Sequence, residues 1–152
     1  MYLLDTNHCS LAINRYPGII TRLAELDQTK ISSCVIVVKA ELIYMAMNSQ
    51  NKQTNLNVVA NFFENIFIYG VDSRTAEIYG SVQAELMRHF GPKEKNKRRK
   101  TRLTDLGVSQ HDLWIASIAI QHDLIVVTMD SDFQRIKTVH DLPVESWYIN
   151  DS

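Results

Sequence analysis

Residues 109–130 read SQHDLWIASIAIQHDLIVVTMD and contain the longest near-continuous apolar stretch of the chain, Leu113–Ile120. The pattern predicts a helix that begins at Ser109 and is apolar almost all round, which indicates burial on several sides. Leu124–Val127 follows as a continuous apolar strand, which leads into Thr128-Met129-Asp130. An apolar strand beside such a helix is typical of a parallel sheet that helices cover on both faces.

Short apolar strands alternate with helical patterns along the rest of the chain. Further strands are predicted at Tyr2–Leu4, which a polar loop at 5–7 follows, at Ile31–Cys34, at Phe67–Tyr69 and, as a last edge strand, at Ser146–Ile149. Helical spacing of apolar residues predicts helices from Pro17, over Val35–Met47, over Leu56–Phe67, and from an N-cap at Ser73 to a stop at Gly91-Pro92. The segment Val35–Met47 is also compatible with a longer strand, and we favour the helix. This order predicts an α/β fold with three layers, α/β/α, and a mainly parallel central sheet.

The composition is typical of one globular domain. The chain has 152 residues, of which 45% are hydrophobic and 22% are charged, and one domain usually has about 100–200 residues. The apolar stretches are far shorter than the roughly 20 residues that cross a bilayer, and no basic residue precedes Arg15, so neither a membrane span nor a secretory signal is expected. Two cysteines, Cys9 and Cys34, favour a reducing compartment. We therefore expect a single cytoplasmic domain over residues 1–152.

The charge is distributed unevenly along the chain. The formal net charge is −1, yet residues 93–102 hold seven of the sixteen Lys and Arg residues, which leaves nine basic against sixteen acidic residues elsewhere. We predict a basic loop at about residues 91–108. The simplest interpretation is a solvated loop, and the alternatives are a surface for polyanions or for an acidic partner.

Four acidic residues stand out by their positions. Asp5 directly follows the first strand, and Asp130 closely follows the strand at Leu124–Val127. Because ligands of parallel sheets bind outside the carboxyl ends of the strands, both carboxylates should lie at one edge. Asp112 lies at the start of the buried helix, and Glu41 interrupts an apolar helix face, although acidic side chains are almost never buried without partners.

Each acidic residue also has a local explanation. Asp5 could cap the turn that follows it, Asp112 could complete a cap that Ser109 begins, Asp130 could shape a turn, and Glu41 could pair with a basic residue. Together, however, converging carboxylates repel one another, by about 3 kcal/mol for two charges about 5 Å apart. Divalent cations with oxygen ligands relieve this repulsion. Such a site suits phosphodiester hydrolysis, in which the metal activates water and one carboxylate orients or deprotonates it.

Four segments occur in a characteristic order: LLDTN at 3–7, EL at 41–42, DLWIA at 112–116 and TMDSDF at 128–133. In this order they resemble PIN-domain ribonucleases, and the compact size resembles the VapC-type toxins of bacterial type II toxin–antitoxin pairs. The resemblance implies an acidic site for Mg²⁺ or Mn²⁺ made by Asp5, Glu41, Asp112 and Asp130. It also implies polar surroundings made by Thr6, Asn7 and Thr128. Asp132 is close enough to contribute to the site, and we place it second to the four acidic residues.

The resemblance implies an endoribonuclease that blocks translation by cutting RNA. Its partners would be the RNA substrate, a small cognate antitoxin that covers the acidic site, and a second copy in a homodimer. Because carboxylates repel phosphate, we expect the phosphate contacts to come from the basic strip, at Lys97, Arg98, Arg99, Lys100 and Arg102. This segment is longer and more basic than in the most compact toxins of this kind. Residues Tyr44, Met45 and Met47 could line a groove for the antitoxin, with packing in the core as the alternative.

Two other functions remain open at this point. A phosphatase of the haloacid-dehalogenase type would use Asp5 as its nucleophile, but that family has a second Asp two residues later, where this chain has Asn7. A catalytically silent domain that binds RNA or protein is the second alternative, and the four acidic residues disfavour it. Zinc is not expected, because His8-Cys9 lacks a second ligand pair at metal spacing.

Overall fold

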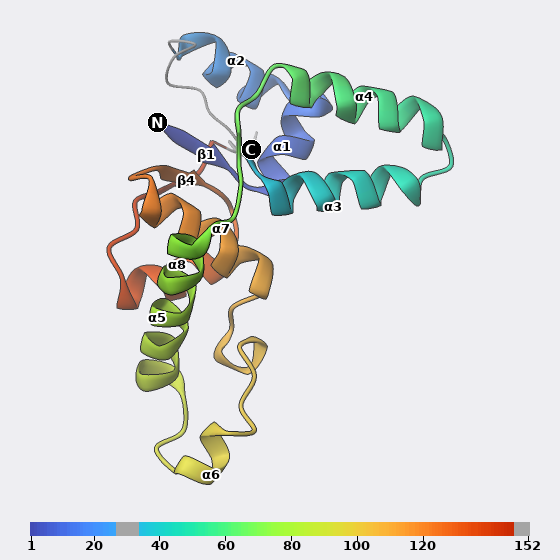
Figure 1. The fold of residues 1–152 in the computed structure, drawn as a ribbon. Coiled ribbons are helices and arrows are strands. Elements are labelled where there is room, and N and C mark those ends of the chain that lie inside the picture. Colours follow the sequence, from blue (N-terminus) through green and yellow to red (C-terminus); the bar gives the residue numbers. More distant parts are fainter. Residues whose placement is uncertain (27–33, 148–152) are drawn as a thin grey trace, which may run out of the picture.

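The computed structural model describes residues 1–26 and 34–147 (Figure 1). The strands are β1 (Tyr2–Leu4), β2 (Cys34–Val35), β3 (Ile68–Tyr69), β4 (Ile125–Val127) and β5 (Val144–Glu145). The helices are α1 (Thr6–Ile13), α2 (Pro17–Glu25), α3 (Ile36–Met47), α4 (Lys52–Glu64), α5 (Ser73–Phe90), α6 (Lys95–Arg98), α7 (Gln110–Gln121) and α8 (Asp132–Val139), with a 3₁₀ turn at Thr104–Leu106. None of the described helices is long and apolar enough to cross a membrane.

Every strand pair in the described part of the chain is parallel, which confirms the predicted class of sheet. One sheet has the order β1-β4-β5, with Leu4 opposite Val127, and a second pair joins β2 to β3. In Figure 1, α2 lies above β1 and β4, α1 lies to the right of β1, and α5, α7 and α8 lie below. Because β1 and β4 are parallel and in register, the residues that follow Leu4 and Val127 emerge at the same edge.

The predicted edge strand at Ser146–Ile149 is wrong within the described residues. The edge strand is Val144–Glu145, while residues 148 and 149 lie outside the described part. Pro143 directly precedes β5, and its carbonyl accepts a hydrogen bond of 2.9 Å from the Val126 amide. Proline has no amide hydrogen and is tolerated at the beginning of an edge strand, which explains where β5 starts. The strand expected at Ile31–Cys34 lies largely outside the described residues, and only its last residue is seen, in β2.

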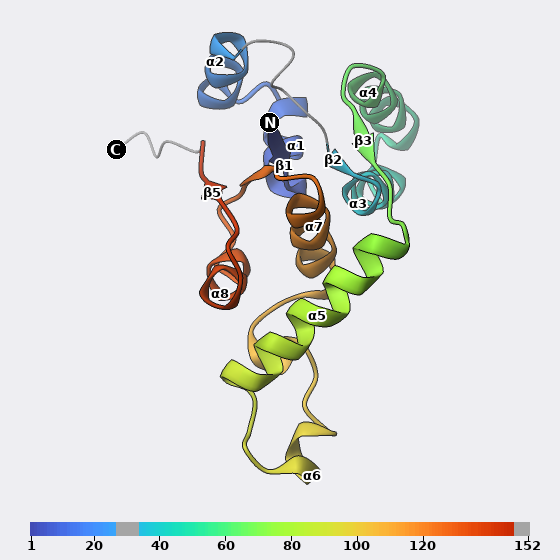
Figure 2. The same ribbon diagram turned by 60° about the vertical axis from the view of Figure 1, so that its left-hand side comes forward.

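Helix α7 forms the centre of the core, as its sequence predicts. Its buried residues are Leu113, Ile115, Ala116, Ser117, Ile118 and Ala119. It packs against α3, α5, α8 and β4, and Figure 2 places it between β1 and α5. Burial on all these sides holds the first turn of α7 rigidly beside the carboxyl ends of β1 and β4.

Two helix starts differ from the prediction. The expected polar loop at 5–7 is instead the beginning of α1, with Asp5 as N-cap, because its carboxylate accepts the His8 amide hydrogen at 2.7 Å. The N-cap of α5 is Asp72 rather than Ser73, because Asp72 and Thr75 form a reciprocal capping box. In both places a carboxylate cap determines where the helix begins.

The basic segment is more ordered than the predicted loop. It contains α6 and the 3₁₀ turn, and Figure 1 shows α6 at the far end of an arm that projects from the body. Leu103, Leu106 and Val108 are buried and anchor the arm. Gly107 has φ +76°, a backbone conformation that favours glycine, and the Arg135 side chain lies close against it, with Nε 2.5 Å from the position of a Cβ.

Candidate active site

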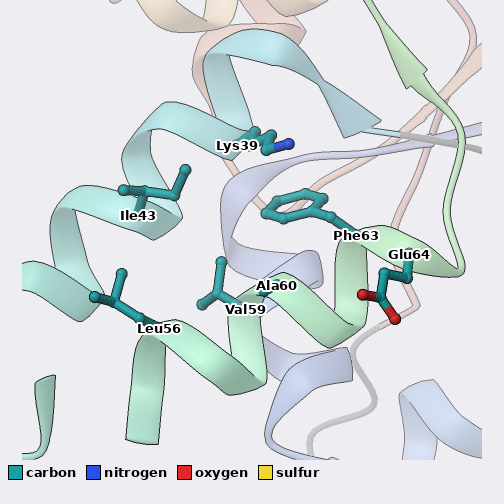
Figure 3. Close-up of a pocket in the computed structure, with 7 residues that line it drawn as sticks. All are labelled: Lys39, Ile43, Leu56, Val59, Ala60, Phe63 and Glu64. Atoms are coloured by element: carbon teal, nitrogen blue, oxygen red, sulfur yellow. The ribbon is translucent and has the colours of Figure 1, made fainter. Parts of the chain in front are cut away.

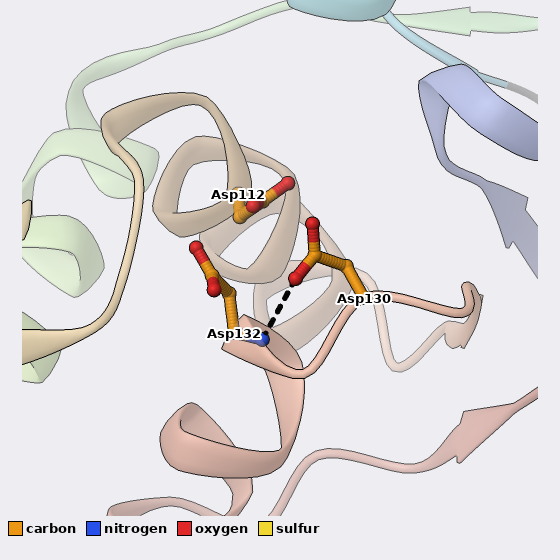
Figure 4. Close-up of side chains that lie close together, drawn as sticks. All are labelled: Asp112, Asp130 and Asp132. Carbon is orange, nitrogen blue, oxygen red and sulfur yellow. Dashed lines mark hydrogen bonds between the residues drawn. The ribbon is translucent and has the colours of Figure 1, made fainter.

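Three aspartates meet beside the carboxyl end of β4. Asp112 lies in the first turn of α7, Asp130 lies three residues beyond β4, and Asp132 begins α8. One carboxylate oxygen from each lies within 4.8 Å of the others (Figure 4). The Asp132 amide also donates a hydrogen bond of 2.9 Å to Asp130 Oδ1. Asp132, which we expected only as a further contributor, therefore lies in the same cluster as Asp112 and Asp130.

Ser109 positions two members of this cluster. Its hydroxyl accepts the Asp112 amide hydrogen at 3.0 Å and donates to Asp112 Oδ2 at 2.8 Å. Its own amide donates to Asp132 Oδ2 at 2.7 Å. The expected helix cap is therefore present and also supports the acidic cluster.

Asp130 is positioned by the residue that directly follows β4. The Thr128 hydroxyl accepts the Asp130 amide hydrogen at 2.9 Å, and Thr128 is buried. This short hydrogen-bonded turn directs the chain from the sheet into α8. Thr128 thus supports the site through the backbone of its acidic neighbour.

Asp5 lies at the same edge of the sheet, on the neighbouring strand. Its amide donates to the Val127 carbonyl at 3.1 Å, which continues the β1–β4 pairing by one residue. Its side chain is buried, and Oδ1 accepts hydrogen bonds from the backbone and ring of His8. The negative charge of Asp5 is felt at the cluster, because it contributes to raising the pKa of Asp130.

Glu41 lies on α3 and does not belong to the three-aspartate cluster. It accepts a hydrogen bond from the Thr6 hydroxyl, and its Oε1 lies 2.5 Å from His111 Nδ1. The sequence left open that Glu41 pairs with a basic residue, and in the structure that residue is His111, directly before Asp112. Through these two contacts Glu41 connects α3 to the starts of α1 and α7. Asn7, the residue after Thr6 in α1, is exposed.

The electrostatics of the cluster favour a bound cation or bound protons. Burial raises the pKa of Asp112 to about 7, helped by the charges of Asp130 and Asp132 and opposed by the Ser109 hydroxyl. Burial also raises the pKa of Asp130, with the charges of Asp132 and Asp5 adding to it and the Asp132 amide opposing it. Two carboxylates about 5 Å apart repel by about 3 kcal/mol. All the donors are carboxylate oxygens, and that donor set fits a hard cation such as Mg²⁺ or Mn²⁺.

The basic residues expected to bind RNA lie within α6 and directly after it, and α6 is at the far end of the projecting arm (Figure 1). Lys97 forms an ion pair of 3.0 Å with Glu94, and Arg98 Nε donates to the Pro92 carbonyl at 2.6 Å. These two cations have roles within the arm itself. Arg99, Lys100 and Arg102 are exposed.

Three residues near the acids were not singled out as part of the site by the sequence: His8, Ser109 and His111. Ser109 was expected only as a helix cap, and a serine three residues before a candidate ligand was the signal for a larger role. His111 carried no signal for its partner, because Glu41 is far from it in sequence. His8 lies in a helix that the sequence pattern did not predict.

Residues 2–139 match the family model described as PIN domain, and the chain belongs to the PIN-domain family. Its curated relatives include the tRNA(fMet)-specific endonuclease VapC of Shigella flexneri, 32% identical over 96% of this chain and 97% of the relative. Ribonuclease VapC2 of Rickettsia felis is 29% identical over 97% of this chain and 98% of the relative. These matches confirm the predicted resemblance to VapC-type proteins.

Solved structures give the same result for the fold. VapBC2 from Rickettsia felis, bound to a DNA fragment from its promoter, is similar with a TM-score of 0.75 and 26% identity, over 97% of this chain and 98% of that chain. DNA-bound VapBC from Salmonella typhimurium has a TM-score of 0.75 and 27% identity over the same shares of the two chains. The predicted α/β/α fold is thereby confirmed over nearly the whole chain.

Proposed function

We propose that this protein is a divalent-metal-dependent endoribonuclease and the toxin of a toxin–antitoxin pair. The observation that carries the proposal is the convergence of Asp112, Asp130 and Asp132, with Asp5 on the adjacent strand, at one edge of the sheet. The relatives named ribonuclease or endonuclease VapC support RNA as the substrate. A catalytically silent domain would not need this repulsive arrangement of carboxylates.

The roles of the residues follow from their positions. The cluster aspartates and Asp5 would hold the cation, which when bound supplies an activated water and neutralises charge on the phosphate. Ser109 keeps the carboxylates of Asp112 and Asp132 in place, and Thr128 holds the backbone of Asp130, through the hydrogen bonds described above. Glu41 is paired with the exposed ring of His111, the residue before Asp112, and would orient water or accept a proton from it.

Phosphate contacts would come from the arm. Among the residues that the structure describes, the side chains of the exposed cations Arg99, Lys100 and Arg102 have no interactions like those of Lys97 and Arg98. Because the arm projects from the body, it would touch the RNA at a point separate from the scissile phosphate. Its contribution would therefore be to affinity, and the acidic cluster would supply the chemistry.

A small antitoxin is the proposed inhibitor, because the structural relatives are VapBC complexes. An inserted Arg would suit the acidic edge, since its planar fork can bridge two carboxylates.

Packing in the core is excluded for Tyr44, Met45 and Met47, which are all exposed on α3. Beside them, a mainly apolar hollow opens between α3 and α4, lined by Ile43, Leu56, Val59, Ala60 and Phe63, with Lys39 and Glu64 at its border (Figure 3). An apolar segment of the antitoxin would lie against this face. The homodimer with a second copy of this chain, which we expected from the sequence, stays a prediction.

The function is tested by cleavage of labelled RNA with purified protein, with chelator or with added Mg²⁺ or Mn²⁺. Initiator tRNA is the first substrate to try, because the Shigella relative is named for it. Cleavage at defined positions that needs the cation and is lost in Asp112→Asn would support the proposal. Equal cleavage in chelator, or by Asp112→Asn, would overturn it.

The toxin role is tested by expressing the chain in cells. Growth arrest would support this role if co-expression of the reading frame beside the gene relieves it and Asp5→Asn abolishes it.

A further inference from the structure

His8 is a fully buried imidazole in contact with a candidate metal ligand. It lies in the first turn of α1, its side chain is 0% exposed, and its Nδ1 is 3.0 Å from Asp5 Oδ1. The backbone amide of His8 donates to the same oxygen at 2.7 Å. One residue therefore holds one oxygen of the Asp5 carboxylate through two hydrogen bonds.

The other ring nitrogen of His8 has no partner. Nε2 is buried and makes no hydrogen bond within the described part of the chain. Because the Asp5 carboxylate can only accept, Nδ1 of a neutral ring carries the hydrogen and Nε2 keeps a bare lone pair. A buried acceptor without a partner costs stability, and an apolar side chain of similar size would avoid that cost. The contribution of the imidazole is therefore its hydrogen bond to Asp5.

These two hydrogen bonds occupy one oxygen of the Asp5 carboxylate and leave the other open. Oδ1 is occupied by His8, whereas Oδ2 accepts no hydrogen bond from the described residues. Without the ring, Asp5 would keep only the helix-cap bond from the backbone amide, about which the carboxylate can turn more freely. Hydrogen-bonded partners of this kind orient metal ligands, and their loss typically weakens metal binding about 10- to 100-fold.

We propose that His8 is a positioning residue that holds the Asp5 carboxylate with Oδ2 available to the cation. The inference rests on the proposed function, since it needs a cation at the acidic edge. His8 acts only through Asp5. Removing its ring should therefore change cation affinity without preventing folding.

The test uses the full chain and Mn²⁺, with binding measured by loss of the free-ion electron paramagnetic resonance signal and by calorimetry. His8→Leu removes the donor and fills the space, and it should bind Mn²⁺ about tenfold more weakly while its metal-free melting temperature stays the same or rises. His8→Asn keeps a donor near the position of Nδ1 and should retain most of the wild-type affinity. The matched control is Cys9→Ala, at the next buried position of α1, which should bind Mn²⁺ like wild type.

The outcomes separate this inference from the proposed function. Equal Mn²⁺ affinity of wild type, His8→Leu and His8→Asn would overturn the positioning role and leave the metal site intact. Equal weakening in Cys9→Ala and both His8 variants would mean a general packing effect and would also overturn it. If His8→Leu does not fold, His8→Gln, whose amide is displaced from the Nδ1 position, replaces it and should bind more weakly than His8→Asn. No Mn²⁺ binding by wild type would overturn the proposed function itself.

Discussion

The backbone amide of Ser109 donates a hydrogen bond of 2.7 Å to Oδ2 of Asp132, and this bond joins the start of α7 to the start of α8. The Ser109 hydroxyl at the same time holds the carboxylate of Asp112. Two carboxylates on different helices are thus oriented by a single residue. Their repulsion is tolerated because α7 is buried in the core and cannot turn away.

Replacing Ser109 by alanine should destabilise the protein by about 1 kcal/mol, the usual cost of losing a helix N-cap. It should also weaken cation binding, because Asp112 loses its hydroxyl donor. Ser131→Ala is the matched control, since Ser131 precedes α8 without capping it through its side chain. Chemical denaturation and Mn²⁺ titration measure both effects, and identical behaviour of the two variants would contradict the role of Ser109.

Replacing Asp132 by asparagine should stabilise the metal-free protein, by up to about 3 kcal/mol, because a repelling charge is removed while an oxygen remains to accept the Ser109 amide. The same variant should gain less stability from Mg²⁺ or Mn²⁺ than wild type does. Asp141→Asn, at an exposed position near β5, is the control and should change neither value. A less stable metal-free Asp132→Asn would show that the cluster is not under electrostatic strain.

The stability of the metal-free protein should depend on pH through Asp112. The pKa of Asp112 is raised to about 7, whereas an unfolded chain titrates Asp near about 3.9. Between these values the folded state holds a proton that the unfolded state has released, so this group lowers the free energy of unfolding as pH rises from about 4 to about 7.

The measurement for Asp112 is chemical denaturation in chelator at several pH values across this window. Asp112→Asn lacks the group, so the stability difference between wild type and variant should grow in favour of the variant as pH rises, and level off above about pH 7. Saturating Mg²⁺ should remove the effect, because the cation competes with the proton. A difference that does not change with pH would be inconsistent with a raised pKa.

The arm should contribute a salt-dependent share of RNA affinity. The double variant Lys100→Ala/Arg102→Ala should reduce the slope of log affinity against log salt by about 0.7 for each phosphate of a single strand that these side chains neutralise. Lys52→Ala/Lys137→Ala removes the same charge from exposed positions on α4 and α8 and should leave the slope unchanged. If both double variants keep the wild-type slope, the arm is a solvated surface segment and does not bind RNA.

The exposed apolar face of α3 should bind the antitoxin. Tyr44→Ser should weaken the complex with the neighbouring gene product by about tenfold, as expected for an aromatic residue within an interface. Val71→Ser changes an exposed apolar residue outside α3 and α4 and is the control. Titration calorimetry of the purified proteins measures this, and unchanged affinity for Tyr44→Ser would remove α3 from the interface.

The sequence predicted the parts of the site that follow strand ends. Asp5 and Asp130 were expected at one edge because parallel strands end together, and the register of Leu4 with Val127 puts them there. The sequence did not predict that Asp132 lies within the three-aspartate cluster, since that depended on α8 beginning at this residue and on the hydrogen bond from its amide to Asp130. Helix α1 was missed because its first turn is polar and reads as a loop.

Interactions between residues distant in sequence account for what else was missed. Glu41 meets Thr6 and His111 only because α3 packs against α1 and α7. The order in the basic arm comes from buried residues and from Arg135 of α8, which packs against Gly107. Neither pairing leaves a periodic pattern that a single sequence could reveal.

The most direct test of the account measures Mn²⁺ binding and RNA cleavage on the same preparations of wild type and Asp112→Asn. The account predicts that wild type binds Mn²⁺, cuts RNA only when Mn²⁺ or Mg²⁺ is present, and that Asp112→Asn stays folded but loses both properties together. Cleavage by chelator-treated wild type at the full rate, or by Asp112→Asn without bound cation, would contradict the claim that these carboxylates form the catalytic metal site.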